Sequence, residues 1–137
     1  MKTSTLAFAA AVVTCALSAP AVSQGPKDWV DIRNAKELRD LHSNKTHEGN
    51  ERLGHYRADG KVVFVFRGRL QGRKPEPGTW EIKGEDQVCV TSASALRSST
   101  DCFRFQRHRD NNAWVTSRNV ATGSLRSVTV AQGIPKF

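Results

Sequence analysis

The chain has 137 residues, with 21 Lys or Arg against 13 Asp or Glu, and a formal net charge of +8 at pH 7. This length suits one domain, and 25% charged and 38% hydrophobic residues exclude a disordered polyelectrolyte and a multi-span membrane protein. Three cysteines are too few for a fold that is held together mainly by disulfides.

Residues 1–23 differ in composition from the rest of the chain and predict a secretory signal peptide. Lys2 is the only charged residue there, an apolar run covers 6–17, and small residues follow over 18–23. The apolar run is too short for a membrane-spanning helix, which needs about 20 such residues. The sequence therefore predicts export and no transmembrane span in the mature chain.

The small residues at the end of this segment allow two cleavage sites, after Ala21 or after Ser23. Either site would release the mature protein into the periplasm or the extracellular space. Acylation of Cys15, as in a lipoprotein, is the less favoured alternative because Thr14 stands where Gly, Ala or Ser is usual.

Residues 24–33 predict an extended lead-in, and residues 34–137 a single folded domain. A helix of about two turns should follow Asn34, whose side chain can cap the first backbone N–H groups, with Glu37 placed as in a capping box. Apolar residues recur there at helical spacing, so the helix must dock on the rest of the domain to persist.

Beyond residue 43 the hydrophobic pattern changes to the alternation that is typical of strands. Asp59-Gly60 is a hairpin signal, Pro75 and Pro77 should keep the residues around them out of a central ladder, and the polar stretch 92–101 predicts a loop. Runs bounded by such turn signals predict strands over 52–58, 61–66, 78–83, 87–91, 102–107, 113–118 and 124–131.

About seven or eight short strands with regularly spaced turns indicate an all-β fold. We expect a single antiparallel meander, curled or closed into a barrel, that carries the short N-terminal helix. A sandwich is the second choice. The alternation assigns bulky aromatic side chains to the core, namely Trp80, Trp114, Phe64, Phe66, Phe103 and Phe105.

Cys89 and Cys102 are the two cysteines that remain after removal of the signal peptide. The alternation places both on the non-core side of what could be neighbouring antiparallel strands. An even number of cysteines in an exported chain favours a disulfide, which would contribute about 3 kcal/mol in the chain-entropy model.

The block 78–89, Gly-Thr-Trp through to Cys, carries a family resemblance. Together with the helix and Thr46, the Tyr56-x-x-Asp-Gly turn, and Cys102 before an aromatic-rich strand, it resembles small exported proteobacterial proteins catalogued as domain of unknown function 995. The resemblance covers most of residues 35–107. It implies a periplasmic β-protein without an assigned activity, so no catalytic residue can be carried over.

Gly78-x-Trp80 is also similar to the Gly-x-Trp of lipocalin-type barrels, in which the Trp closes one end of the barrel. In those proteins the motif lies on the first strand, whereas here it lies in the middle of the chain. From this similarity we expect only a small barrel in which Trp80 is buried.

Two basic clusters are the candidate binding residues, because guanidinium groups hold phosphate and carboxylate groups bidentately. An anionic polymer of the cell envelope, a lipid headgroup or an acidic protein would be the partner. Nucleic acid is not expected, since the chain is predicted to be exported and carries no recognised nucleic-acid module. The candidate residues are Arg67, Arg69, Arg73, Lys74, Arg104 and Arg107.

No catalytic residue, metal or cofactor is predicted. The chain has no G-x-S-x-G nucleophile motif and no H-x-x-x-H or H-E-x-x-H pair, and most carboxylates occupy turn positions. His42 and His47 near Glu48 would be a conceivable surface metal site, which we set aside for lack of such a motif.

The sequence thus favours a monomeric, non-enzymatic exported β-protein that binds an anionic component through its Arg-rich surface. One alternative is a carrier that holds a small apolar ligand inside the barrel, suggested by Trp80 and the apolar run 62–66. Another is a secreted enzyme inhibitor. An interior filled by the four phenylalanines 64, 66, 103 and 105 would argue against the carrier.

Overall fold

The computed structural model describes residues 28–94 and 97–133, so the predicted signal peptide, both cleavage sites and Cys15 lie outside the described residues. The elements, in chain order, are β1 (Trp29–Asp31), α1 (Ala35–His42), β2 (Lys45–Glu48), β3 (Arg52–Tyr56), β4 (Lys61–Phe66), the 3₁₀ turn η1 (Gly68–Leu70), β5 (Glu76–Lys83), β6 (Gln87–Ser94), β7 (Arg97–His108), β8 (Trp114–Asn119) and β9 (Leu125–Gln132).

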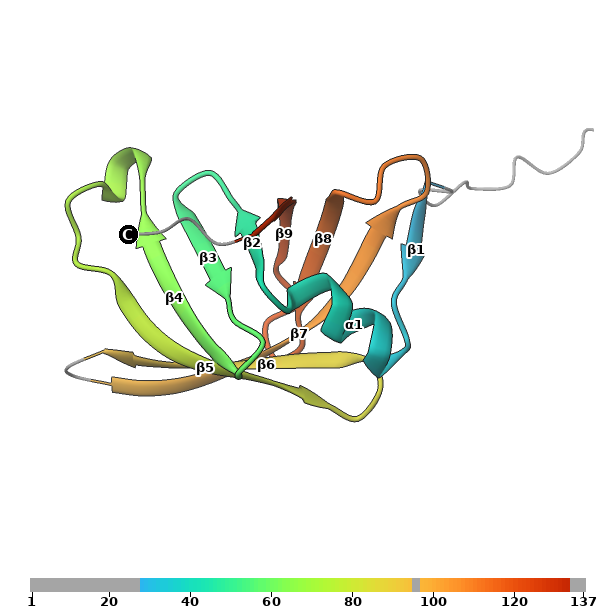
Figure 1. The fold of residues 1–137 in the computed structure, drawn as a ribbon, viewed down its shortest axis with the longest axis horizontal. Coiled ribbons are helices and arrows are strands. Elements are labelled where there is room, and N and C mark those ends of the chain that lie inside the picture. The colour runs from blue at the N-terminus through green and yellow to red at the C-terminus, as the bar shows by residue number, and fades with distance from the viewer. Residues whose placement is uncertain (1–27, 95–96, 134–137) are drawn as a thin grey trace, which may run out of the picture.

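Strands β2 to β9 form an antiparallel meander in which each strand pairs with the next one in the chain, and β9 pairs with β2. The sheet therefore closes into an eight-stranded barrel, with β1 added beside the last residues of β7. This confirms the predicted all-β barrel with one short helix (Figure 1). Within the described residues no helix is long and apolar enough to cross a membrane.

Alternating strand directions give the barrel two ends. We call the end that carries the loops 49–51, 67–75 and 120–124 the open end, and the end nearest α1 the helix end. Helix α1 packs against β2, β5 and β6, and its buried residues Leu38 and His42 reach into the interior. The helix end is consequently filled by side chains.

The start of α1 follows the predicted cap. The Asn34 carboxamide oxygen accepts hydrogen bonds from the backbone N–H groups of Lys36 and Glu37, at 2.8 and 3.3 Å. The Glu37 carboxylate does not complete a capping box but pairs with Arg107 Nε on β7 at 2.9 Å. The helix is thereby tied to the barrel wall as well as capped.

Several predicted strand limits were wrong. The polar stretch 92–101 is not a loop: β6 and β7 continue through it as a hairpin, in which Thr91 and Thr100 are joined through their hydroxyls at 2.8 Å. Residues 45–48 form strand β2, which the sequence did not single out. Hydroxyl pairs between strands stabilise the β6–β7 hairpin, and barrel closure stabilises β2. Neither contribution requires the alternation of apolar residues by which a strand is predicted from sequence.

Pro77 lies inside β5, paired with Val63 of β4, which differs from the predicted exclusion of this segment from the ladder. The Trp80 backbone N–H points toward β4, because it donates to Gly60 O beside that strand. Backbone N–H groups alternate in direction along a strand, so an N–H at position 77 of β5 would point the opposite way, toward β6. Pairing with β6 begins at Gly78, so the N–H that Pro77 lacks would have had no ladder partner.

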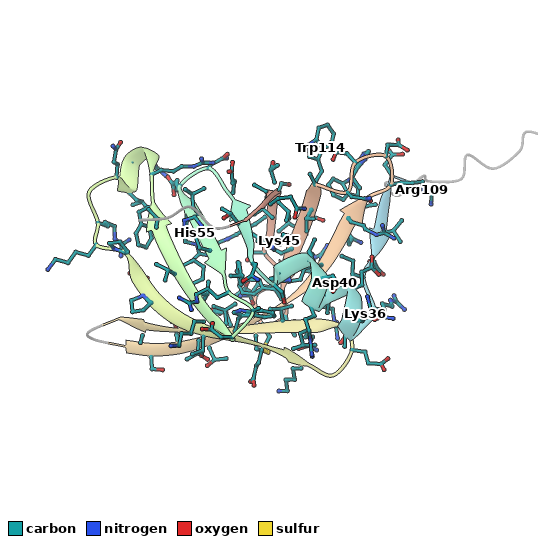
Figure 2. All side chains as sticks on the ribbon, viewed as in Figure 1. Lys36, Asp40, Lys45, His55, Arg109 and Trp114 are labelled. Atoms are coloured by element: carbon teal, nitrogen blue, oxygen red, sulfur yellow. A yellow bond between two sulfur atoms is a disulfide. The ribbon has the colours of Figure 1, made fainter. Side chains whose placement is uncertain are left out.

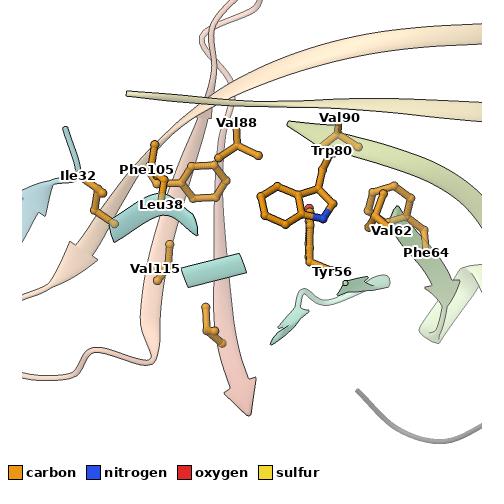
Figure 3. Packing of buried hydrophobic residues seen from close by; sticks show 11 residues of the cluster. Ile32, Leu38, Tyr56, Val62, Phe64, Trp80, Val88, Val90, Phe105 and Val115 are labelled. Carbon is orange, nitrogen blue, oxygen red and sulfur yellow. The ribbon is translucent and has the colours of Figure 1, made fainter. Parts of the chain in front are cut away.

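The core occupies the helix end and the middle of the barrel. Figure 3 shows Trp80 at its centre, with Tyr56 below it and Phe105 on one side. The Trp80 indole N–H donates to Arg57 O at 2.8 Å, so its one polar atom is satisfied. The buried hydrophobic residues are Ile32, Leu38, Tyr56, Val62, Phe64, Trp80, Val88, Val90, Phe105, Val115 and Val130.

Cys89 of β6 and Cys102 of β7 lie directly opposite each other and form a disulfide, as predicted. Their neighbours Val88 and Val90 point into the core, so the bridge lies on the outer face of the sheet. It links β6 to β7 within their hairpin.

The prediction that Trp114 belongs to the core was wrong, because its side chain is 51% exposed at the start of β8 (Figure 2). The inward positions of β8 are Val115 and Ser117, which leaves Trp114 outside. Its ring packs edge-on to His108, with 5.3 Å between the ring centres.

Candidate functional site

The half of the barrel toward the open end is hollow. A cavity of about 920 Å³ opens there, and its walls carry the aromatic side chains Phe64, Phe66, Phe103 and Phe105. This volume falls in the range of protein sites for small ligands. The four phenylalanines line the interior without filling it.

Two small residues stand at inward positions of the cavity wall. Ser117 of β8 is opposite Phe105 of β7, and Gly54 of β3 is opposite Phe64 of β4. A Cβ atom on Gly54 would lie 2.8 Å from Tyr56 Cε2 and 3.2 Å from Phe64 Cε1. Both rings therefore lie against a backbone that only glycine provides.

The inner end of the cavity is formed by aromatic rings and imidazoles. His47 and Tyr56 line it, with 4.7 Å between their ring centres. Behind them His42 packs against His47 at 4.4 Å, against Phe105 at 4.7 Å and against Trp80 at 5.6 Å. These rings separate the cavity from the filled helix end.

The burial of these histidines differs from the surface position that the sequence suggested. His42 is fully buried and its Nδ1 lies 2.8 Å from Leu38 O, so Nδ1 carries the proton and donates. Its Nε2 is buried and has no hydrogen-bond partner among the described residues. His47 likewise donates from Nε2 to Leu41 O, at 3.0 Å. The two rings dock the end of α1 onto the barrel interior.

Burial keeps this region uncharged at neutral pH. Desolvation lowers the pKa of His47 to about 4 and lowers the pKa of His42 well below 6.5, the latter also through the nearby His47. Desolvation raises the pKa of the Tyr56 hydroxyl to about 12. The inner end of the cavity therefore offers aromatic faces and neutral polar atoms.

Part of the first predicted basic cluster lies at the open end. Arg69 and Arg73 line the cavity, but Arg69 Nε donates to Glu51 Oε1 at 2.8 Å and Arg73 Nη2 lies 3.3 Å from Glu76 Oε1. The Arg73 guanidinium also packs over the Phe66 ring at 4.5 Å. Arg67 Nε donates to Gly49 O at 2.8 Å, and Lys74 is exposed.

The second cluster lies elsewhere, on β7. Arg104 points to the outer face of the barrel, where it pairs with Asp86 at 3.0 Å and borders a depression of about 470 Å³. Arg107 pairs with Glu37 of α1. The structure thus separates the two predicted clusters and gives most of their arginines an oxygen partner.

Two further arginines reach the cavity that the sequence did not single out. Arg52 begins β3 and shares its inward face with Gly54 and Tyr56. Arg126 is the second residue of β9 and lies on the inward face that carries Val128. The alternation around Tyr56 could have indicated Arg52, since residues two apart on a strand share a face. It could not have shown that this face borders a cavity.

The closed meander, with an interior that opens at one end, is an architecture compatible with a lipocalin-like fold. Comparisons with family models, with curated proteins and with solved structures found no match for this chain. The resemblance to domain of unknown function 995 thus stays a prediction. Within the described residues, no cluster of His, Cys, Asp and Glu side chains is arranged to hold a metal ion.

Proposed function

We propose that this protein is an exported carrier that binds a small, largely apolar molecule in the barrel cavity. The observation that carries the proposal is the hollow of about 920 Å³ walled by Phe64, Phe66, Phe103 and Phe105. Ligand sites in proteins are typically concave, mostly apolar and lined by a few polar groups, and they occur in the mouths of β-barrels. The open end supplies the entrance.

The cavity supports binding better than the arginine surface does. Of the six predicted anion-binding residues, Arg67, Arg69, Arg73, Arg104 and Arg107 already contact a carboxylate or carbonyl oxygen. An external anion would have to displace these partners, and exposed ion pairs gain little free energy in water. The predicted anion surface therefore takes second place to the cavity.

Export remains part of the proposal. It is supported by the composition of residues 1–23 and by the Cys89–Cys102 disulfide, which persists in oxidising compartments. An exported protein whose cavity combines phenylalanine walls with polar groups would carry a poorly soluble molecule through an aqueous space. No chemical step is needed for that role.

Titration with N-phenyl-1-naphthylamine, a neutral apolar fluorophore, tests the proposal. We expect one saturable site on the wild-type protein with a blue-shifted emission. Ser117→Leu places an apolar side chain into the cavity and should weaken binding about tenfold while leaving the fold intact. Cavity-filling changes of this kind commonly stabilise a protein by about 0.5–2 kcal/mol.

Thr129→Leu is the matched control, because Thr129 is exposed on the outward face of β9, next to the inward Val128 and Val130. This variant should bind the fluorophore as the wild type does. Absence of saturable binding, or equal loss in both variants, would contradict a cavity site.

A further inference from the structure

Charge is unevenly distributed around the cavity. Four arginines (Arg52, Arg69, Arg73 and Arg126) and two glutamates (Glu51 and Glu76) line it, which leaves a net charge of +2. Each glutamate contacts one arginine, as described above. The uncompensated charge is therefore that of Arg52 and Arg126.

Arg52 and Arg126 have no carboxylate within 4.0 Å among the residues that the structure describes. The Arg52 guanidinium lies over the Phe64 ring, 4.4 Å from its centre, and is held there against the cavity wall. Arg126 lies at the same end, at the start of β9. Neither guanidinium group is occupied by a protein anion.

The two guanidinium groups also repel each other. Burial is the main cause that lowers the pKa of Arg52. The charge of Arg126 also lowers it, whereas Tyr56 and, more weakly, the carboxylates of Glu76 and Asp101 raise it. Two cations that face one space and form no ion pair with a carboxylate repel each other, and a bound anion would relieve this repulsion. Guanidinium groups suit that role because their fixed N–H donors match the oxygens of carboxylate and phosphate.

The arginines and the apolar walls follow one another along the cavity. Arg52 is opposite Phe66 at the open end of the β3–β4 pair, and Gly54 and Phe64 come next toward the helix end. On the other side, Arg126 is followed by Val128. A ligand with one anionic end could thus place its charge at the entrance and its apolar part against the phenylalanines.

We infer that the ligand of this cavity is an anionic amphiphile, whose carboxylate or phosphate head is held by Arg52 and Arg126 and whose apolar tail contacts the phenylalanine walls. This inference rests on the proposed carrier function and adds the chemical class of the ligand. It also distinguishes these two arginines from the paired ones at the barrel rim.

The test is displacement of bound N-phenyl-1-naphthylamine by dodecanoate and dodecyl phosphate below their micellar concentrations, and by dodecanol below its solubility limit. The three competitors share one tail and differ in the head. A hydrogen bond to a charged group contributes about 1.5–3 kcal/mol, so the better anion should bind about tenfold to a hundredfold more tightly than dodecanol. The anion that binds more tightly shows whether the site prefers a carboxylate or a phosphate head group.

In the double variant Arg52→Gln/Arg126→Gln, the ratio of the affinity for the anion to the affinity for dodecanol should fall to near one. The neutral fluorophore should still bind. The control Arg109→Gln/Arg118→Gln removes the same charge from exposed positions on the outside of the barrel and should keep the preference. Should the double variant fail to fold, Arg126→Gln alone, at an exposed position, should still lower the preference severalfold.

The possible failures are distinguishable. If the fluorophore binds and dodecanol displaces it as well as both anions do, the inference of an anionic ligand is wrong but the proposed carrier function stands. A preference that survives Arg52→Gln/Arg126→Gln, or that is lost equally in the control, would overturn the role of the two arginines. Absence of fluorophore binding would overturn the carrier function itself.

Discussion

Acidification from pH 7 to pH 5 should destabilise the fold through the buried histidines. His42 and His47 are neutral in the folded protein, and their rings pack 4.4 Å apart among aromatic side chains. Desolvation lowers the pKa of His47 from 6.5 to about 4 and lowers that of His42 as well. In the unfolded chain both imidazoles return to ordinary values and take up protons first.

The sign and size of the effect follow from linkage. Because the folded-state pKa is depressed, the contribution of His47 is complete above pH 6.5 and is lost as the pH falls from 6.5 toward 4. At pH 5 the unfolded chain binds this proton almost fully and the folded chain about a tenth, which costs about 2 kcal/mol. His42 adds a loss of the same sign. Tyr56, which contacts both rings, stays neutral throughout because its pKa is raised to about 12.

Urea unfolding at pH 7 and pH 5 measures this loss directly, with the m-value as the check on two-state behaviour. His47→Gln keeps a donor for Leu41 O but does not titrate, so the pH-dependent loss should shrink by about 2 kcal/mol. His108→Gln, at the surface between two tryptophan rings, is the matched control and should keep the full loss. A loss below about 0.5 kcal/mol in the wild type, or an unchanged loss in His47→Gln, would refute the reasoning.

Four further variants test the packing and the disulfide. Gly54→Ala should destabilise the barrel by about 1–3 kcal/mol in urea unfolding, since its Cβ would lie 2.8 Å from a neighbouring ring; a neutral effect would show that the wall adjusts. Replacing Cys89 and Cys102 by Ser should cost about 3 kcal/mol of stability, and equal unfolding midpoints with and without the bridge would contradict this. Trp80→Ala should cost about 3–5 kcal/mol and Trp114→Ala less than about 1 kcal/mol, so the reverse order in thermal unfolding would contradict the core assignment.

Local signals in the sequence were sufficient for several elements. Asn34 marks the helix start, Asp59-Gly60 the β3–β4 hairpin, and the faces of Cys89 and Cys102 their bridge. Each depends on a few neighbouring residues or on one strand pair. Chemistry at this scale is visible in the order of residue types.

Barrel closure and the hollow interior could not be predicted in the same way. Closure joins β2 to β9, whose partners Thr46 and Ala131 are far apart in the chain, and no turn signal connects them. The cavity depends on how side chains of neighbouring strands fit together: Ser117 lies opposite Phe105, whereas the Phe64 and Tyr56 rings occupy the space in front of Gly54. The sequence pattern gives the face of a residue but not the volume left in front of it.

Charged and titratable residues were the least predictable part of the candidate site. The basic run from Arg67 to Lys74 attracted attention by its density, whereas Arg52 and Arg126 stand alone in the sequence and meet only in the closed barrel. The sequence suggested a surface position for His42 and His47 because they flank the end of the predicted helix, with Glu48 nearby. Their burial results from the docking of α1 into the interior, which helical periodicity alone does not show.

Intermolecular nuclear Overhauser effects from protein-bound dodecanoate test the central claim most directly, because they report where an amphiphile lies. A ligand in the cavity should give contacts from its methylene chain to the side chains of Phe66, Phe103 and Val128. Contacts that lie instead along the outer depression near Arg104 and Arg118, or no contacts at saturating dodecanoate, would contradict a binding site inside the barrel.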